Sequence, residues 1–176
     1  MGSRSRSAAR RWSRFRILRA VARWNKGSEV IERLLAAGHL ERVPADGDTA
    51  AALIASARRH IASAAVTANN DPEGAFALAY DAARKTATAL LAHQGLRPTS
   101  AGGHLVVVEA INAQFPGVAG LKSIDRLRRR RNQAEYPDPQ HYDSVISDEV
   151  ADAIEVAEAC VAAAEKLIAA PQLGVF

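Results

Sequence analysis

The stretch DPEGAFALAYDAARKTATALLAHQG, residues 71–95, decides the fold class of this chain of 176 residues. Asp71 followed by Pro72 is typical of a helix start, because aspartate caps free backbone N–H groups and proline fits the first turn. Apolar side chains then recur at spacings of four and three, which places them along one side of a helix. These side chains are Phe76, Tyr80, Ala83, Ala87 and Leu90. The pattern predicts a helix over 72–93 that ends before Gly95 and packs in a bundle.

Similar patterns predict further helices. We expect them near 10–24, 29–37, 49–67, 104–114, 121–135 and 148–169, with Ser28, Asp46 or Asp48, and Ser147 as caps and Gly38 as a stop signal. No segment alternates apolar and polar residues for long enough to predict a sheet. Apolar residues make up 48% of the chain and aromatic residues only 5%, a composition that suits packed helices. The predicted fold class is all-α, an up-down bundle of four to five core helices preceded by short accessory helices.

The charges divide the chain into an arm and a body. Residues 1–26 hold nine basic side chains and no acidic one, whereas the rest holds 14 basic and 19 acidic side chains. We expect a basic arm at 1–26, partly disordered or a short helix, an accessory helix and turn at 27–47, the bundle at 48–170 and a tail at 171–176. Three interpretations of the arm stay open: a solvated tail, a nucleic-acid tether through Arg10, Arg11 and Arg14, or a helix on a membrane surface.

Other features of the composition indicate the cellular compartment of the protein and whether it holds a metal or a cofactor. A single cysteine excludes an intramolecular disulfide, no segment reads as a signal peptide, and no apolar run approaches the ~20 residues of a membrane span. We therefore expect a cytoplasmic protein. The five histidines and Cys160 lack the spacing of metal ligands, so the sequence predicts neither a metal nor a cofactor. Cys160 adjoins the apolar stripe of the last helix and is expected in the core.

One basic stretch, residues 123–137, departs from the bundle pattern. At helical spacing Ile124, Leu127, Arg131 and Ala134 share one face, so Arg131 stands where a bundle buries an apolar residue. A buried guanidinium is costly unless a carboxylate or phosphate meets it, and Glu135 is the nearest carboxylate. Two interpretations follow: an Arg131–Glu135 clamp that fastens the end of the bundle, or a site at which Arg131 meets an incoming phosphate.

The neighbours of Arg131 carry further expectations. Arg128 lies at the edge of the same face, while three arginines point elsewhere and are expected to be solvated, namely Arg126, Arg129 and Arg130. Asn132 and Tyr136 are four residues apart and lie together on the flank of the helix, where their polar groups gather beside Arg131. If nucleic acid binds here, we expect Arg128 and Arg129 to contribute contacts to it.

The segment Arg131-Asn132-Gln133-Ala134-Glu135-Tyr136 resembles a motif of the HEPN superfamily, which consists of α-helical bundle domains, often dimeric, in prokaryotic toxin–antitoxin and defence systems. Its ribonuclease members carry an arginine, usually followed by a polar residue such as asparagine, and a histidine four to six residues further on. Here Tyr136 stands where that histidine is expected. The pattern is similar to a branch with Arg-x-x-Ala-Asp-Tyr, and the resemblance covers about residues 49–170.

The resemblance implies two functions. In the first, the chain is an RNA-binding toxin or defence effector and a weak, metal-independent endoribonuclease, with Arg131 on the phosphate, Asn132 and Tyr136 as hydrogen-bonding supports, and two copies pairing as a homodimer. Tyrosine is a poor general base near neutral pH, so any activity is expected to be weak or to be carried by a different histidine. His104 either approaches the site or packs at its helix start, and packing is preferred. In the second, the chain is a non-catalytic module that pairs with a nucleotidyltransferase, another effector or an antitoxin, and Tyr136 is a modification site.

Overall fold

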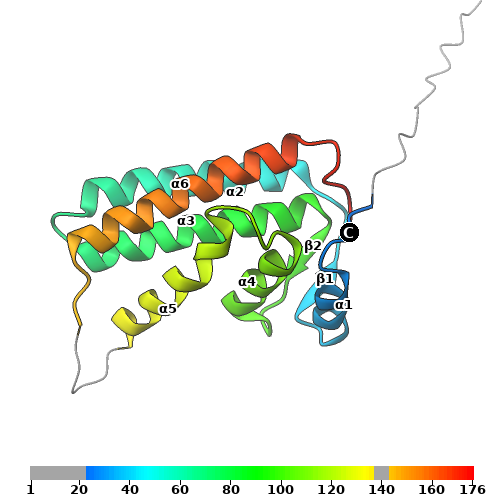
Figure 1. Cartoon of the computed structure of the whole chain (residues 1–176), viewed down its shortest axis with the longest axis horizontal. Coiled ribbons are helices and arrows are strands. Elements are labelled where there is room, and N and C mark those ends of the chain that lie inside the picture. Colours follow the sequence, from blue (N-terminus) through cyan, green and yellow to red (C-terminus); the bar gives the residue numbers. More distant parts are fainter. Residues whose placement is uncertain (1–22, 137–142) are drawn as a thin grey trace, which may run out of the picture.

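A computed structural model describes residues 23–136 and 143–176, and helices dominate these ranges, as the composition predicts (Figure 1). In chain order the elements are α1 (Ser28–Ala36), β1 (Leu40–Arg42), α2 (Gly47–Thr67), α3 (Pro72–His93), β2 (Leu96–Pro98), α4 (Gly103–Gln114), a short 3-10 helix η1 (Leu121–Ser123), α5 (Ile124–Glu135) and α6 (Ser147–Ala169). In the described part of the chain, none of the helices combines the length and apolar character that a membrane crossing requires. The all-α prediction is confirmed.

Helix α3 forms the centre of the fold. All five residues of its predicted apolar seam are buried, and Asp71 caps the helix by accepting a hydrogen bond from the Gly74 N–H at 2.8 Å. Helices α2 and α6 pack along one side of α3, whereas α4 and α5 lie on the other (Figure 1). Since α3 contacts each of these four helices, it holds together the two layers that surround the candidate site.

The helix starts show which caps the sequence predicts correctly. Asp46 caps α2, accepting from the Thr49 N–H at 2.8 Å. The caps expected at Ser28 and Ser147 are wrong, because α1 and α6 begin at these residues and the N-cap positions belong to Gly27 and Ile146. Instead of a serine, Glu149 satisfies the start of α6 by accepting from the Ile146 N–H at 3.1 Å.

The described residues also contain a two-stranded sheet that the sequence analysis missed. Strands β1 and β2 pair antiparallel, with Leu40 opposite Pro98. Three residues are too few for an alternating pattern to stand out. The helix expected over 121–135 also differs, because its first three residues form η1 and the α-helix begins at Ile124.

The two ends of the described chain meet beside the sheet. Arg23 forms a parallel bridge with Val175, and the Trp24 N–H donates to the Val175 carbonyl at 3.0 Å. The expected helix over 10–24 lies outside the described residues except for 23 and 24, and these two are not helical. Arg10, Arg11 and Arg14 also lie outside the described residues.

Replacing Gly120 by alanine is expected to lower the free energy of unfolding by about 2 kcal/mol or more. Gly120 has φ +82°, and a Cβ there would come within 2.7 Å of the backbone nitrogen of Cys160 in α6. Gly117→Ala is the matched control, since nothing lies within 4 Å of a Cβ there. Urea denaturation measures the free energy of unfolding of both variants. Equal values would refute the account that Gly120 permits the close contact between the segment before η1 and α6.

Candidate RNA-binding site

Helix α5 directs Arg131 toward α3, as its place on the apolar stripe predicts. Ile124 and Leu127 on the same stripe are fully buried, and Ala134 packs against the core. The Arg131 side chain is 26% exposed and forms an ion pair with Glu135 one turn along the helix. Glu135 is itself 41% exposed, so the pair stands at the rim of the core, where solvent and ligands reach it.

A pocket of about 230 Å³ opens between α3 and α5 beside this ion pair. Arg131, Ala134 and Glu135 line it from α5. The start of α3 contributes the opposite wall, formed by Glu73, Gly74, Phe76 and Ala77. Arg131 is the basic group among these lining residues, and an anion that enters the pocket has to compete with Glu135 for the guanidinium.

His104, the second residue of α4, lies in the electrostatic range of Arg131. Its ring centroid is 6.0 Å from that of Tyr80 on α3. Burial lowers the pKa of His104, and the positive charges of Arg84 and Arg131 lower that pKa further. The sequence favours a packing role for His104. In the structure its ring packs beside Tyr80, and the charge of Arg131 acts on its pKa.

Tyr80 is a buried residue of α3 that contacts His104 and experiences the charge of Arg131. Its side chain is 2% exposed, and its hydroxyl has no hydrogen-bond partner among the described residues. Burial raises the pKa of Tyr80, whereas the charges of Arg84, Arg128 and Arg131 act to lower that pKa. Three arginines from two helices thus act electrostatically on one buried hydroxyl. We call Arg84, His104, Arg128 and Arg131 together the Arg131 site.

The arginines of the Arg131 site form ion pairs with nearby carboxylates. Asp125 accepts from Arg128 at 2.9 Å and also pairs with Arg129 at 2.6 Å. Asp81 forms ion pairs with both Arg84 and Lys85. The Nδ1 atom of His60 lies 2.9 Å from Oδ2 of Asp81. Each arginine of the Arg131 site thus has a carboxylate partner, which for Arg131 is Glu135, so an incoming phosphate has to compete with these ion pairs.

The other predicted site residues occupy more exposed positions. Asn132 is exposed, and Tyr136, at the C-terminal cap of α5, is 74% exposed. Arg129 is solvated as predicted, with a side chain that is 68% exposed. Arg126 is also largely exposed and pairs with Asp152 on α6 at 2.7 Å.

The expectation that Arg130 is solvated is wrong. Its side chain is 14% exposed, and its Nε donates to Glu149 at 2.7 Å. It also donates to the carbonyls of Asp143 and Ser144, and the hydrogen bond to Glu149 lowers the pKa of that carboxyl. Arg130 therefore fastens α5 to the start of α6, a contact that a helical wheel of α5 alone does not reveal.

Within the described ranges, no group of three or more histidine, cysteine, aspartate and glutamate side chains is arranged to hold a metal ion. Cys160 is fully buried in α6, as the sequence predicts, and burial raises the pKa of its thiol to about 12.

Comparison with protein families finds one match: a family model described as HEPN domain covers residues 50–170. Comparisons with curated proteins and with solved structures found no match. The matched range begins in the first turn of α2 and ends just after α6, so it includes every helix that contributes to the Arg131 site.

Proposed function

The chain belongs to the HEPN family, and from this premise we propose that it binds RNA at the Arg131 site and cleaves it slowly without a metal ion. The observation that carries the proposal is the packing of His104 against Tyr80 of α3, where the charge of Arg131, the arginine of the motif, acts on the pKa of this titratable group. The resemblance favours a setting in a prokaryotic toxin–antitoxin or defence system and a homodimer that brings two sites together.

Arg131 is the phosphate-binding group in this proposal. A guanidinium offers a planar fork of N–H donors that matches two phosphate oxygens. Helix α4, which carries His104, has no side-chain cap, and the N–H groups of such a first turn favour an anion. Arg84 and Arg128 add positive charge on either side, and Asn132 and Tyr136 offer hydrogen bonds to the same strand from the outer face of α5.

His104 supplies the proton transfer that Tyr136 cannot. Its lowered pKa keeps the imidazole neutral at neutral pH, which is the form that accepts a proton. The ribose 2′-oxygen forms a bond to phosphorus while the bond to the 5′-oxygen breaks. His104 takes the proton of the 2′-hydroxyl, and water gives a proton to the departing 5′-oxygen. The products are a 2′,3′-cyclic phosphate and a free 5′-hydroxyl.

A second candidate function rests on Tyr136. Its exposed position at the end of α5 leaves the side chain open to another protein. In this alternative the chain is a non-catalytic module, and a partner nucleotidyltransferase transfers nucleotide to the Tyr136 hydroxyl. Mass spectrometry after incubation with such a partner would detect the addition, and the Tyr136→Phe variant would lack it.

RNA binding tests the proposed function through Glu135. Replacing Glu135 by glutamine frees Arg131 from its ion pair and removes a negative charge from the pocket. An exposed ion pair is worth roughly 1 kcal/mol, so we expect RNA to bind about fivefold more tightly. Fluorescence anisotropy with a labelled single-stranded RNA measures the change. The control is Glu41→Gln, which releases Arg97 in the small sheet. If Glu135→Gln leaves the affinity unchanged, the phosphate does not meet Arg131.

A further inference from the structure

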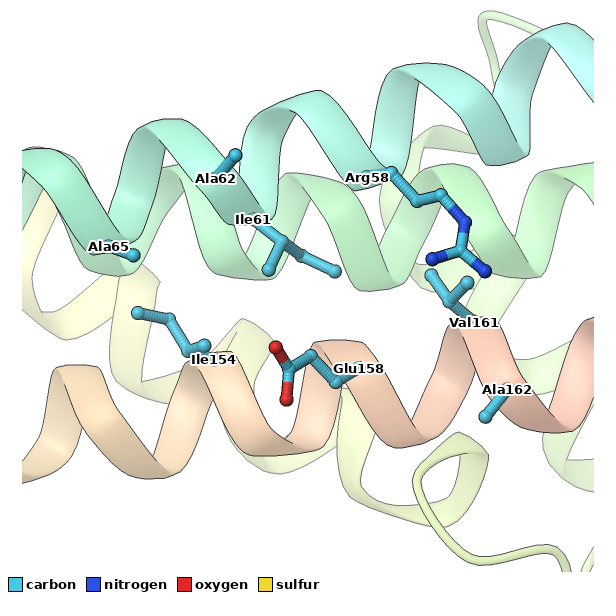
Figure 2. A pocket seen from close by; sticks show the side chains of 8 residues that line it. All are labelled: Arg58, Ile61, Ala62, Ala65, Ile154, Glu158, Val161 and Ala162. Atoms are coloured by element: carbon cyan, nitrogen blue, oxygen red, sulfur yellow. The ribbon is translucent and has the colours of Figure 1, made fainter.

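A groove runs between α2 and α6, on the side of α3 away from the Arg131 site. It contains two pockets of about 420 and 530 Å³. Figure 2 shows the first, where Ile61 of α2 and Ile154 of α6 point into the space between the helices. Ile54 and Ile168 line the second pocket. The groove therefore has an apolar floor that follows both helices.

Small side chains form the rims of the groove. The exposed stripe of α6 repeats at spacings of four and three, and so does that of α2. On α6 the stripe comprises Ala151, Glu155, Glu158, Ala162, Glu165 and Ala169. On α2 it comprises Ala51, Ala55, Arg58, Ala62 and Ala65. Alanine rims leave room for the side chains of another segment to approach the backbone of both helices.

The groove carries an excess of negative charge. Arg58 forms an ion pair with Glu165 across the groove at 2.7 Å, so its positive charge is already balanced. Glu158 lines the pocket in Figure 2, and Glu155 stands on the same stripe. Neither of these two carboxylates forms an ion pair within the part of the chain that the structure describes. An occupant of this groove needs apolar side chains and positive charge.

Residues 1–22 have this combination. They carry seven arginines and no acidic residue, together with Trp12, Phe15 and Leu18 at helical spacing. At that spacing Arg11 and Arg19 fall on the same side as these apolar residues. The arm therefore offers cations beside bulky apolar groups, which complements carboxylates beside an apolar floor.

The position of Arg23 brings this segment to one end of the groove. Arg23 pairs with Val175 just beyond α6, on the side of the fold where α2 begins and α6 ends (Figure 1). Gly47 and Ala169 line the pocket at that end. As a helix, 22 residues span ~33 Å, which matches the ~34 Å of the 23-residue α6. The arm is thus long enough to follow the groove from end to end.

We propose that residues 1–22 dock along the α2–α6 groove of their own chain, with Trp12, Phe15 and Leu18 on its apolar floor and arginines against Glu155 and Glu158. The inference is independent of RNA cleavage, because the groove and the Arg131 site lie on different sides of α3. In the docked state the arm is an intramolecular ligand of the bundle.

Distance measurement between two spin labels tests the docking. One label is placed on the arm at Ser13→Cys and the other at Ser63→Cys, an exposed α2 position outside the lining residues. Cys160 is fully buried and does not take a label. We expect one narrow distance distribution, which becomes at least about twofold broader when Glu155 and Glu158 are both changed to lysine. Glu29→Lys on α1 is the control and should keep the narrow distribution.

Four outcomes would overturn the proposal. The first is a distribution as broad in the parent protein as in the lysine variant. The second is a narrow distance that disappears when labelled chains are diluted with unlabelled ones, which would place the arm on a second copy. The third is a distribution that narrows only when RNA is added, which would make the arm a nucleic-acid tether. If the lysine variant fails to fold, Arg11→Glu with Arg14→Glu replaces it, and a distribution that stays narrow in that variant is the fourth.

Discussion

Replacing Arg131 by alanine is expected to slow RNA cleavage by at least about 100-fold. The guanidinium is the basic group that lines the α3–α5 pocket, and in the proposed mechanism it stabilises the charge that grows on the phosphate oxygens in the transition state. Arg131→Lys should recover only part of the rate, because a lysine keeps the charge and loses the planar pair of donors. Rates are measured with a labelled single-stranded RNA in excess chelator.

The control for Arg131 comes from the same helix. Arg126 is equally basic, but it pairs with Asp152 on α6 and does not line the α3–α5 pocket. Arg126→Ala should leave cleavage within about threefold of the parent rate. Circular dichroism and urea denaturation show whether each variant is folded. A folded Arg131→Ala variant that cleaves at the parent rate would remove the arginine from the chemistry.

The second large effect is expected from His104. Replacing it by alanine should slow cleavage by about 100-fold or more, because a positioned acid or base contributes roughly that factor. The pH dependence identifies the group. The proposed mechanism needs neutral His104, so the rate is expected to rise as the pH increases through the pKa of His104 in the folded protein. Because that pKa is lowered from its ordinary value of about 6.5, the rate should reach half of its maximum below about pH 6.5.

Two comparisons make the His104 result specific. His93→Ala removes a histidine that lines the pocket between α2 and α6, on the other side of α3 from the Arg131 site, and should keep both the rate and the pH profile. The His104→Ala variant should lose most of the rate. The rate that remains should no longer rise with pH on the acidic limb of the pH profile. If that limb persists unchanged, the titrating group is a different residue and the assignment of His104 is wrong.

The sequence predicts those parts of the fold that depend on local signals. The aspartate caps at positions 46 and 71 and the seam of α3 are encoded within one or two helical turns, and the structure confirms them. The placement of Arg131 toward the core and the nearness of Glu135 likewise follow from a helical wheel. These features could be predicted because all the interacting groups belong to one helix.

Features that join distant segments could not be predicted in this way. Arg130 looks solvated on the wheel of α5, yet it binds Glu149 at the start of α6. The ring contact between Tyr80 and His104 depends on how α4 packs against α3. In our proposal His104 of α4 takes the place of the histidine that the motif lacks in α5, and the packing that brings α4 against α3 is not encoded within any single helix.

The most direct test of the central claim is to incubate the unmodified protein with single-stranded RNA in excess chelator and to identify the ends of the products. The account predicts cleavage that proceeds without divalent metal and yields 2′,3′-cyclic phosphate and 5′-hydroxyl ends. RNA that remains intact at high protein concentration, or cleavage that appears only when a metal ion is restored, would contradict it.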